Sequence, residues 1–124
     1  MDLPETRPAI GLSGAVLLAI STFPDIEIAR RIARELVETR IVACANLGNP
    51  VESIYRWQEK VETNNETLVI FKFAAERYPD FEKRLRELHP YEVPEIIAFP
   101  LTKGSQTYLD WVRPNAPSST TDRG

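Results

Sequence analysis

The residues of this chain best suited to chemistry lie in one short stretch, His89-Pro-Tyr-Glu-Val-Pro-Glu95. It contains the only histidine of the chain, a tyrosine and two carboxylates, which are types that move protons or ligate metal ions. Two prolines stiffen the stretch, because proline fixes its own φ and keeps the preceding residue out of the helical region. A stiff connector holds its polar side chains at fixed angles, which favours a site. The alternative is a rigid linker in which His89 only caps a helix.

His89 is a candidate metal ligand or general base, and the nearby carboxylates are its candidate partners. Glu92 and Glu95 are three residues apart in a segment expected to be extended, so they are predicted to point to roughly opposite sides. Such a pair chelates an ion poorly within one chain, and a site that used both would need groups from elsewhere, such as Lys60, Lys72 or Arg56 of a neighbouring copy. The candidate binding residues are Trp57, Lys60, Lys72, Tyr91, Glu92 and Glu95.

Cys44 is the only cysteine and the second candidate metal ligand. It lies in an apolar run, so the competing interpretation is a small buried hydrophobic residue. A soft metal such as copper favours thiolate or thioether ligands, with imidazole next. One cysteine, one histidine and one methionine do not make a strong soft-metal site in one chain. We therefore expect Cu²⁺ to bind weakly and no cofactor to be obligatory.

The composition indicates a single globular domain and excludes a general nucleic-acid binder. The chain has 124 residues, 43% of them apolar, with a net charge of −3 and a pI near 5.2. Nucleic-acid binders normally present a basic face, and residues 67–74 lack the glycine–aromatic pattern of an RNA-recognition strand. The sequence has no glycine-rich phosphate loop, and its single cysteine cannot form an internal disulfide.

An apolar run at residues 9–20 partly resembles a secretory signal. Asp2 and Glu5 oppose that interpretation, because a signal begins with a positive segment, and residues 16–20 are needed for the first strand. No apolar run approaches the ~20 residues of a membrane span. We therefore expect no membrane association and a cytoplasmic location, with secretion as the alternative.

Hydrophobic periodicity predicts one α+β domain at residues 14–113, with disordered tails at 1–13 and 114–124. The predicted strands are 15–21, 41–57 with a bend at 48–50, 67–74 and 95–101. The predicted helices begin after Thr22 or Asp25, near Glu76, and after Ser105. The polar residues 59–66 are expected to form the far end of a long hairpin.

This order of elements is typical of the ferredoxin-like split βαβ sandwich, here with a short C-terminal helix. In that fold a four-stranded antiparallel sheet carries two helices on one face. The first and third strands are apolar on both faces, yet the chain has nothing large enough to cover the second face. Another copy of the chain is therefore expected to bury it.

Several motifs occur in a consistent order from about residue 16 to residue 112. They are Ser53-Ile-Tyr-Arg-Trp57, Glu76-Arg77-Tyr78-Pro79, the stretch from His89 to Glu95, and Tyr108-Leu-Asp-Trp111. Together they closely resemble the CutA family, the divalent-cation tolerance proteins. The resemblance implies a homotrimer whose three sheets enclose a shared interior, with the matching His, Tyr and Glu positions at a cleft between subunits.

The resemblance also implies a non-enzymatic role in tolerance of divalent metal ions such as copper. Weak binding of metal ions or of a small molecule is then expected at the intersubunit clefts. This chain departs from copper-linked relatives in carrying Ser21, Thr22 and Arg84 where thiols occur, which weakens a soft-metal site. Two alternatives remain: a PII-like sensor of a small molecule, or a small enzyme with His89 as base beside Glu92 or Glu95.

Overall fold

The computed structural model describes residues 15–113, and the two predicted tails lie outside the described residues. The described elements are β1 (Val16–Phe23), α2 (Ile26–Glu38), β2 (Cys44–Trp57), β3 (Lys60–Ala74), the 3₁₀ turn η1 (Ala75–Arg77), α3 (Tyr78–Leu88), β4 (Ile97–Pro100) and α4 (Gln106–Val112). Between residues 15 and 113, none of the helices has the length and apolar character needed to cross a membrane.

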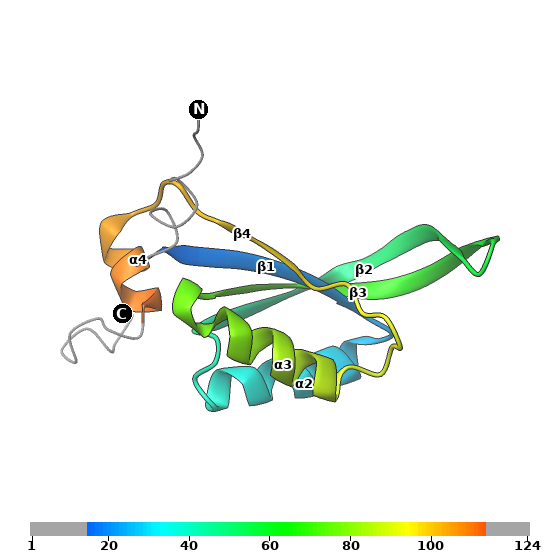
Figure 1. Ribbon diagram of the computed structural model, residues 1–124, viewed down its shortest axis with the longest axis horizontal. Coiled ribbons are helices and arrows are strands. Elements are labelled where there is room, and N and C mark those ends of the chain that lie inside the picture. The colour runs from blue at the N-terminus through cyan, green and yellow to red at the C-terminus, as the bar shows by residue number, and fades with distance from the viewer. Residues whose placement is uncertain (1–14, 114–124) are drawn as a thin grey trace.

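The four strands form one antiparallel sheet in the order β2-β3-β1-β4. Helices α2 and α3 lie together on one face of this sheet, and the β2–β3 hairpin extends well beyond the body of the molecule (Figure 1). The predicted α+β architecture with a long hairpin is confirmed.

The core lies between the sheet and the two helices, where buried and less buried residues of β3 alternate. Val69, Phe71 and Phe73 of β3 are buried and face the helices. The ring of Phe81 from α3 lies 4.5 Å from the ring of Phe73 and 5.2 Å from that of Phe71, measured between centroids. Burial of these large side chains, each worth about 1.5–3 kcal/mol, fixes which face of the sheet carries the helices.

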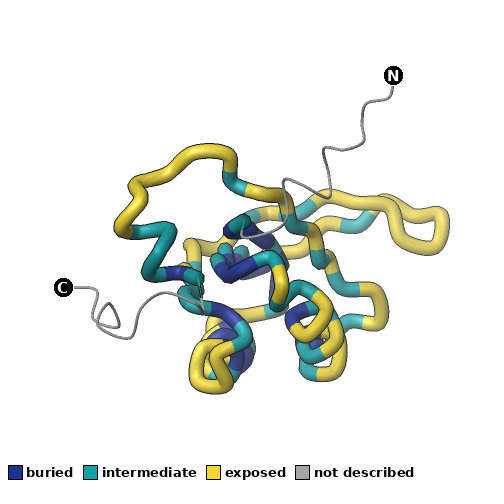
Figure 2. The backbone as a smooth tube through the Cα atoms, turned by 60° about the vertical axis from the view of Figure 1, so that its left-hand side comes forward, coloured by how far each residue is buried: buried dark blue, intermediate teal, exposed yellow. Residues whose placement is uncertain are grey.

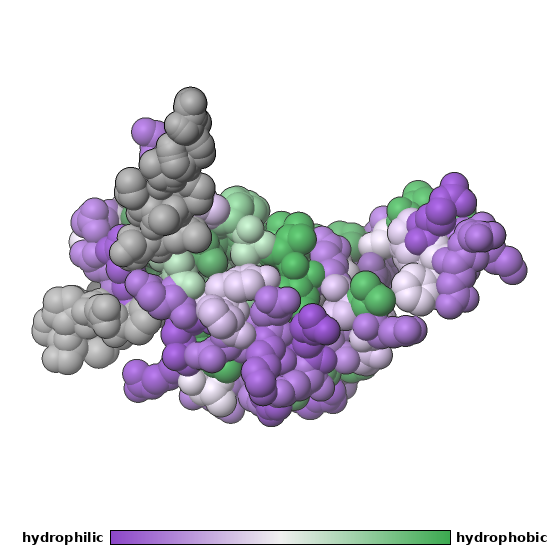
Figure 3. Space-filling view, viewed as in Figure 1, coloured by the Kyte–Doolittle hydropathy of each residue, from purple (hydrophilic) through white to green (hydrophobic). Residues whose placement is uncertain are grey.

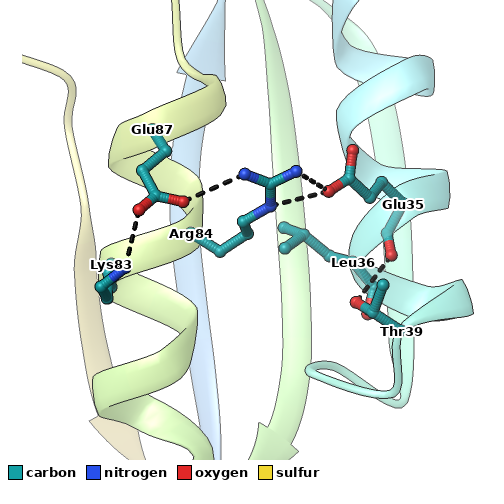
Figure 4. Close-up of polar contacts among 6 residues, drawn as sticks. All are labelled: Glu35, Leu36, Thr39, Lys83, Arg84 and Glu87. Carbon is teal, nitrogen blue, oxygen red and sulfur yellow. Dashed lines mark hydrogen bonds and ion pairs between the residues drawn. The ribbon is translucent and has the colours of Figure 1, made fainter.

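Polar contacts fix the helices locally. Asp25 caps α2, because its Oδ1 accepts a hydrogen bond of 2.8 Å from the backbone N–H of Ile28, whereas Thr22 belongs to β1. Arg84 joins the two helices: its Nε donates to Glu35 of α2 at 2.7 Å and its Nη1 to Glu87 of α3 at 3.0 Å (Figure 4).

The hairpin differs from its prediction. Residues 60–66 belong to β3 and pair with β2 as far as Trp57, and the turn is formed by Gln58 and Glu59. The two strands are largely exposed along this arm (Figure 2), so no buried face distinguishes them from a polar loop in the sequence. Gln58 and Glu59 have φ of 50° and 70°, without the glycine that usually marks such a turn. The predicted bend in β2 is confirmed by a register shift between Leu47 and Pro50.

The second face of the sheet is not covered by α2 or α3 and remains largely apolar. Ile97 and Phe99 of β4 are 52% and 47% exposed, and they pair with Ile20 and Leu18 of β1. Ile20 in turn pairs with Ile70 of β3. Hydrophobic residues gather over the middle of the molecule, above the helices (Figure 3). The fourth strand is shorter than predicted, since residues 95, 96 and 101 lie outside it.

Candidate functional site

His89 ends α3 and turns its side chain into the protein. The backbone of His89, which precedes Pro90, is extended, with φ −72° and ψ 135°, while its N–H still donates to the carbonyl of Leu85. The imidazole is only 7% exposed and stacks on Phe23, with the ring centroids 4.6 Å apart. The helix α3 therefore ends at His89, and the His89 side chain packs against Phe23 of β1.

Both ring nitrogens of His89 have partners within the protein. Nε2 lies 2.8 Å from the carbonyl oxygen of Thr22, and Nδ1 accepts a hydrogen bond of 3.2 Å from the backbone N–H of Tyr91. This pattern assigns a neutral imidazole that carries its proton on Nε2. Burial lowers the pKa of His89, against the opposing effects of the Thr22 carbonyl and of Glu66. In this arrangement His89 has no free lone pair for a metal ion or a substrate proton. Its Nδ1 instead holds the backbone of Tyr91 in place.

Tyr91 connects His89 to a buried carboxylate, that of Glu66. Its hydroxyl donates a hydrogen bond of 2.6 Å to Oε2 of Glu66, which lies on β3 and is 8% exposed. Burial raises the pKa of Tyr91, and the hydrogen bond to Glu66 adds to the increase. Sequence reasoning missed Glu66 because it assigned the residue to a polar hairpin end. The available signal was its place directly before the apolar run of residues 67–71.

A groove of about 670 Å³ opens beside this pair. It lies between the hairpin and the connection that follows α3. The lining residues are Thr22, Ser53, Ile54, Tyr55, Trp57, Asn64, Glu66, Pro90, Tyr91, Glu92, Val93 and Glu95. Among these lining residues three are carboxylates and none is a lysine or an arginine. The groove is therefore acidic, with aromatic walls.

The structure brings four of the predicted binding residues together and separates the other two. Trp57, Tyr91, Glu92 and Glu95 all line the groove. The prediction that Glu92 and Glu95 point to opposite sides is wrong for this site, because the chain bends at residues 91–93 and forms no strand there. Lys60 and Lys72 do not line the groove.

The two lysines lie at other places on the sheet. Lys60 is exposed and pairs with Trp57 beside the hairpin turn. Lys72 has its Nζ 5.6 Å from the centre of the Tyr108 ring, near α4. Among the described residues, neither forms an ion pair with a carboxylate of the groove.

Cys44 lies away from the groove, at the start of β2. Its Sγ is 3.5 Å from Oδ1 of Asn46, and it is partly exposed rather than buried as predicted. The reason is its position: it pairs with Lys72, on a row of the sheet that the helices do not cover. Within residues 15–113 no group of three or more His, Cys, Asp or Glu side chains is arranged to hold a metal ion.

The fold and the groove define a small α+β protein with an acidic groove that has aromatic walls. The chain matches the sequence model of the family described as CutA1 divalent ion tolerance protein, over residues 17–115. It therefore belongs to the CutA family.

Individual relatives agree with this assignment. The chain is 44% identical over 98 residues to the divalent-cation tolerance protein CutA of Thermus thermophilus, covering 79% of this chain and 95% of that protein. It is 42% identical over 117 residues to human Protein CutA, covering 89% of this chain and 65% of the human protein. A solved structure of the divalent cation tolerance protein from Thermus thermophilus superposes with a TM-score of 0.78 at 42% identity, over 82% of this chain and 99% of that one.

Proposed function

We propose that this protein works as a non-enzymatic homotrimer in the response to divalent metal ions. The observation that carries the assembly is the apolar second face of the sheet, where Ile97 and Phe99 are about half exposed beside Ile20. A contiguous apolar surface of this kind on a soluble protein marks a contact with another chain. Packing of this face against two further copies would enclose it.

The long hairpin supports the same assembly. Ile54 and Val61 are 68% and 65% exposed on an arm that projects from the body (Figure 2). Two isolated strands are marginal in water without packing against something else. In a trimer each arm would lie against a neighbouring subunit, which would bring the groove to a boundary between subunits.

Divalent ions are expected to bind weakly at this boundary, with copper as the ion to test and no obligatory cofactor. The supporting observation is the acidic groove, whose exposed carboxylates Glu92 and Glu95 attract cations. Fewer than the usual number of ligands converge within one chain, so a neighbouring subunit or water would complete the coordination. His89 would take part only after losing its hydrogen bond from Tyr91.

The alternatives have less support in this geometry. An acidic lining without lysine or arginine opposes binding of the anions or nucleotides that a PII-like sensor would take. The contacts at both ring nitrogens of His89 oppose a role for it as a general base. A cytoplasmic location is part of the same proposal, and fractionation of the native host cell would test it.

Light scattering tests the assembly directly, with a trimer expected at three times the 14.1 kDa chain mass. Ile97→Asp should abolish assembly, because a charge would be buried in the contact. Val37→Asp is the matched control, since Val37 is an exposed apolar residue on α2, away from the open face. A wild-type monomer would refute the assembly.

Calorimetric titration with Cu²⁺ tests the metal proposal separately. Glu92→Gln with Glu95→Gln is expected to weaken the binding, whereas Glu38→Gln on α2 should not. Submicromolar binding that vanishes in Cys44→Ser would move the site to the sheet face and contradict the proposal.

A further inference from the structure

Glu66 is a buried carboxylate whose charge no cationic side chain of the described residues balances. It is 8% exposed, and Oε2 accepts its hydrogen bond from the Tyr91 hydroxyl. The ion pairs between residues 15 and 113 involve other carboxylates. Removing a carboxylate from water is costly unless a cation and hydrogen bonds compensate for it. Glu66 lines the groove, so a cation entering the groove can supply that compensation.

The walls of the groove suit a cation that also has an apolar part. Tyr55, Trp57 and Tyr91 line it together with Ile54 and Val93. The faces of tryptophan and tyrosine attract ammonium groups, and the effect grows when the pair is removed from water. Alkyl groups pack favourably against the same aromatic and aliphatic surfaces.

The size of the groove favours such a ligand over a bare metal ion. Its volume of about 670 Å³ lies in the range of small-molecule sites. A tightly held metal ion needs several ligands converging at about 2.0–2.6 Å, and the described residues offer no cluster of that kind. Charge, wall chemistry and volume together favour an organic cation.

We propose that the groove binds a small organic ammonium ion, with Glu66 as its buried counter-ion and Trp57 and Tyr91 against its alkyl chain. The exposed Glu92 and Glu95 attract the ligand to the mouth of the groove and pair with a second charge where the ligand carries one. The hydrogen bond from Tyr91 holds the Glu66 carboxylate in place, and His89 holds Tyr91. This inference does not depend on metal binding.

Calorimetric titration of the full chain at neutral pH and low salt tests the proposal. The probes are putrescine, its neutral analogue butanediol, tetramethylammonium and Mg²⁺. Putrescine is expected to bind, butanediol to give no heat of binding, and added salt to weaken the putrescine affinity. Stronger binding of tetramethylammonium would assign a quaternary rather than a primary ammonium. Mg²⁺ that binds as tightly as putrescine would reduce the site to a general attraction for cations and overturn the proposal.

Two carboxylate variants identify the counter-ion. Glu66→Gln keeps an oxygen that can accept the Tyr91 hydrogen bond but removes the charge, and it should weaken putrescine binding by about tenfold or more. Glu38→Gln makes the same change on an exposed part of α2 and should leave the affinity unchanged. Equal losses in the two variants, or no loss in Glu66→Gln, would refute the role of Glu66.

A second pair of variants covers the case in which Glu66→Gln fails to fold. Trp57→Leu should weaken binding several-fold and Trp57→Phe less, because phenylalanine keeps an aromatic face. Circular dichroism and light scattering on every variant separate loss of the ligand from loss of the fold or of the trimer. A trimeric wild type that shows no binding of any ammonium probe would overturn the inference and leave the assembly intact.

Discussion

The carboxylates on helices α2 and α3 and those of the groove differ in whether a basic side chain pairs with them. Five of the six carboxylates on α2 and α3 have a basic partner within reach, and among the described residues only Glu27 of these six forms no ion pair. The pairs are Arg34–Glu38, Arg77–Asp80, Lys83–Glu87, Arg84–Glu35, Arg84–Glu87 and Arg86–Glu82. In the groove Glu66, Glu92 and Glu95 have no such partner among the described residues. Most carboxylates of the two helices are therefore paired with a cation, whereas the groove retains an unbalanced negative charge.

This contrast separates the part of the molecule that maintains the fold from the part that can bind. Ion pairs three or four residues apart on an exposed helix add little stability but leave no net field. An unbalanced carboxylate such as Glu66 is instead held by a chain of contacts that begins at Thr22 and passes through His89 and Tyr91. Its position is fixed although its charge is not neutralised, which is the condition for selective attraction of a cation.

The largest predicted effect concerns His89, which lies in the middle of this series of contacts. His89→Ala would leave a cavity beside Phe23 and free the Tyr91 backbone, at an expected cost of about 2–4 kcal/mol in the free energy of unfolding. Arg84→Met, which breaks the pairs between α2 and α3, should cost much less because those groups are half exposed. Urea unfolding of both variants makes the measurement. A larger loss for Arg84→Met would reverse the contrast between the two regions.

The next effect concerns the hydrogen bond to the buried charge. Tyr91→Phe keeps the ring but leaves Oε2 of Glu66 without its donor, so we expect a loss of about 1–3 kcal/mol. The double variant with Glu66→Gln should lose less, because an amide is cheaper to bury without a partner than a carboxylate. Tyr55→Phe, on the exposed hairpin, is the control. Additive losses in the double variant would mean that the two side chains do not interact in solution.

The sequence predicts most of the fold and four of the twelve residues that line the groove, for physical reasons that differ between residues. Alternation of Val69, Phe71 and Phe73 with less buried neighbours follows from the period of a strand, and it correctly gives the face that the helices cover. Glu66 was missed because a carboxylate on an arm with polar neighbours has no periodic signal. The first part of β3, residues 60–66, was predicted as the end of the hairpin and not as a strand for the same reason, since both of its faces meet solvent.

Lys60 and Lys72 are expected to reach the carboxylates from a neighbouring copy, and within one chain the strand register decides where they lie. Lys72 pairs with Leu18 and Cys44, far along the sheet from the hairpin turn. A register of this kind depends on contacts between strands and is not visible in the local sequence. The bend at residues 91–93 is likewise set by the partners of His89 and Tyr91 on other elements.

A third prediction uses the lowered pKa of His89. Because the pKa in the folded protein lies below that of the unfolded chain, the unfolded chain takes up the proton first as the pH falls below about 6.5. The free energy of unfolding is therefore expected to decrease on acidification, by at most about 1.4 kcal/mol per pH unit for each chain. Urea midpoints measured from about pH 7.5 to 5.5 test this, with His89→Gln as the variant that lacks the titration. An equal slope in the two proteins would assign the pH dependence to other groups.

The smallest predicted effect comes from making the groove resemble the helices. Ser53 lines the groove and pairs with Asn64, so it lies diagonally across from Glu66 on the same face of the hairpin. Ser53→Lys would supply Glu66 with a cation, and a cross-strand pair of opposite charge is worth about 0.2–1 kcal/mol. Ser53→Met, of similar length and without charge, is the matched control for packing. Thermal unfolding should show the lysine variant to be the more stable of the two, and high salt should reduce the difference in stability between them.

The same lysine would occupy the position that the ammonium ligand takes, so putrescine binding should be lost in Ser53→Lys and retained in Ser53→Met. A lysine variant that gains no stability and still binds putrescine would mean that Glu66 is not the unbalanced charge of the groove.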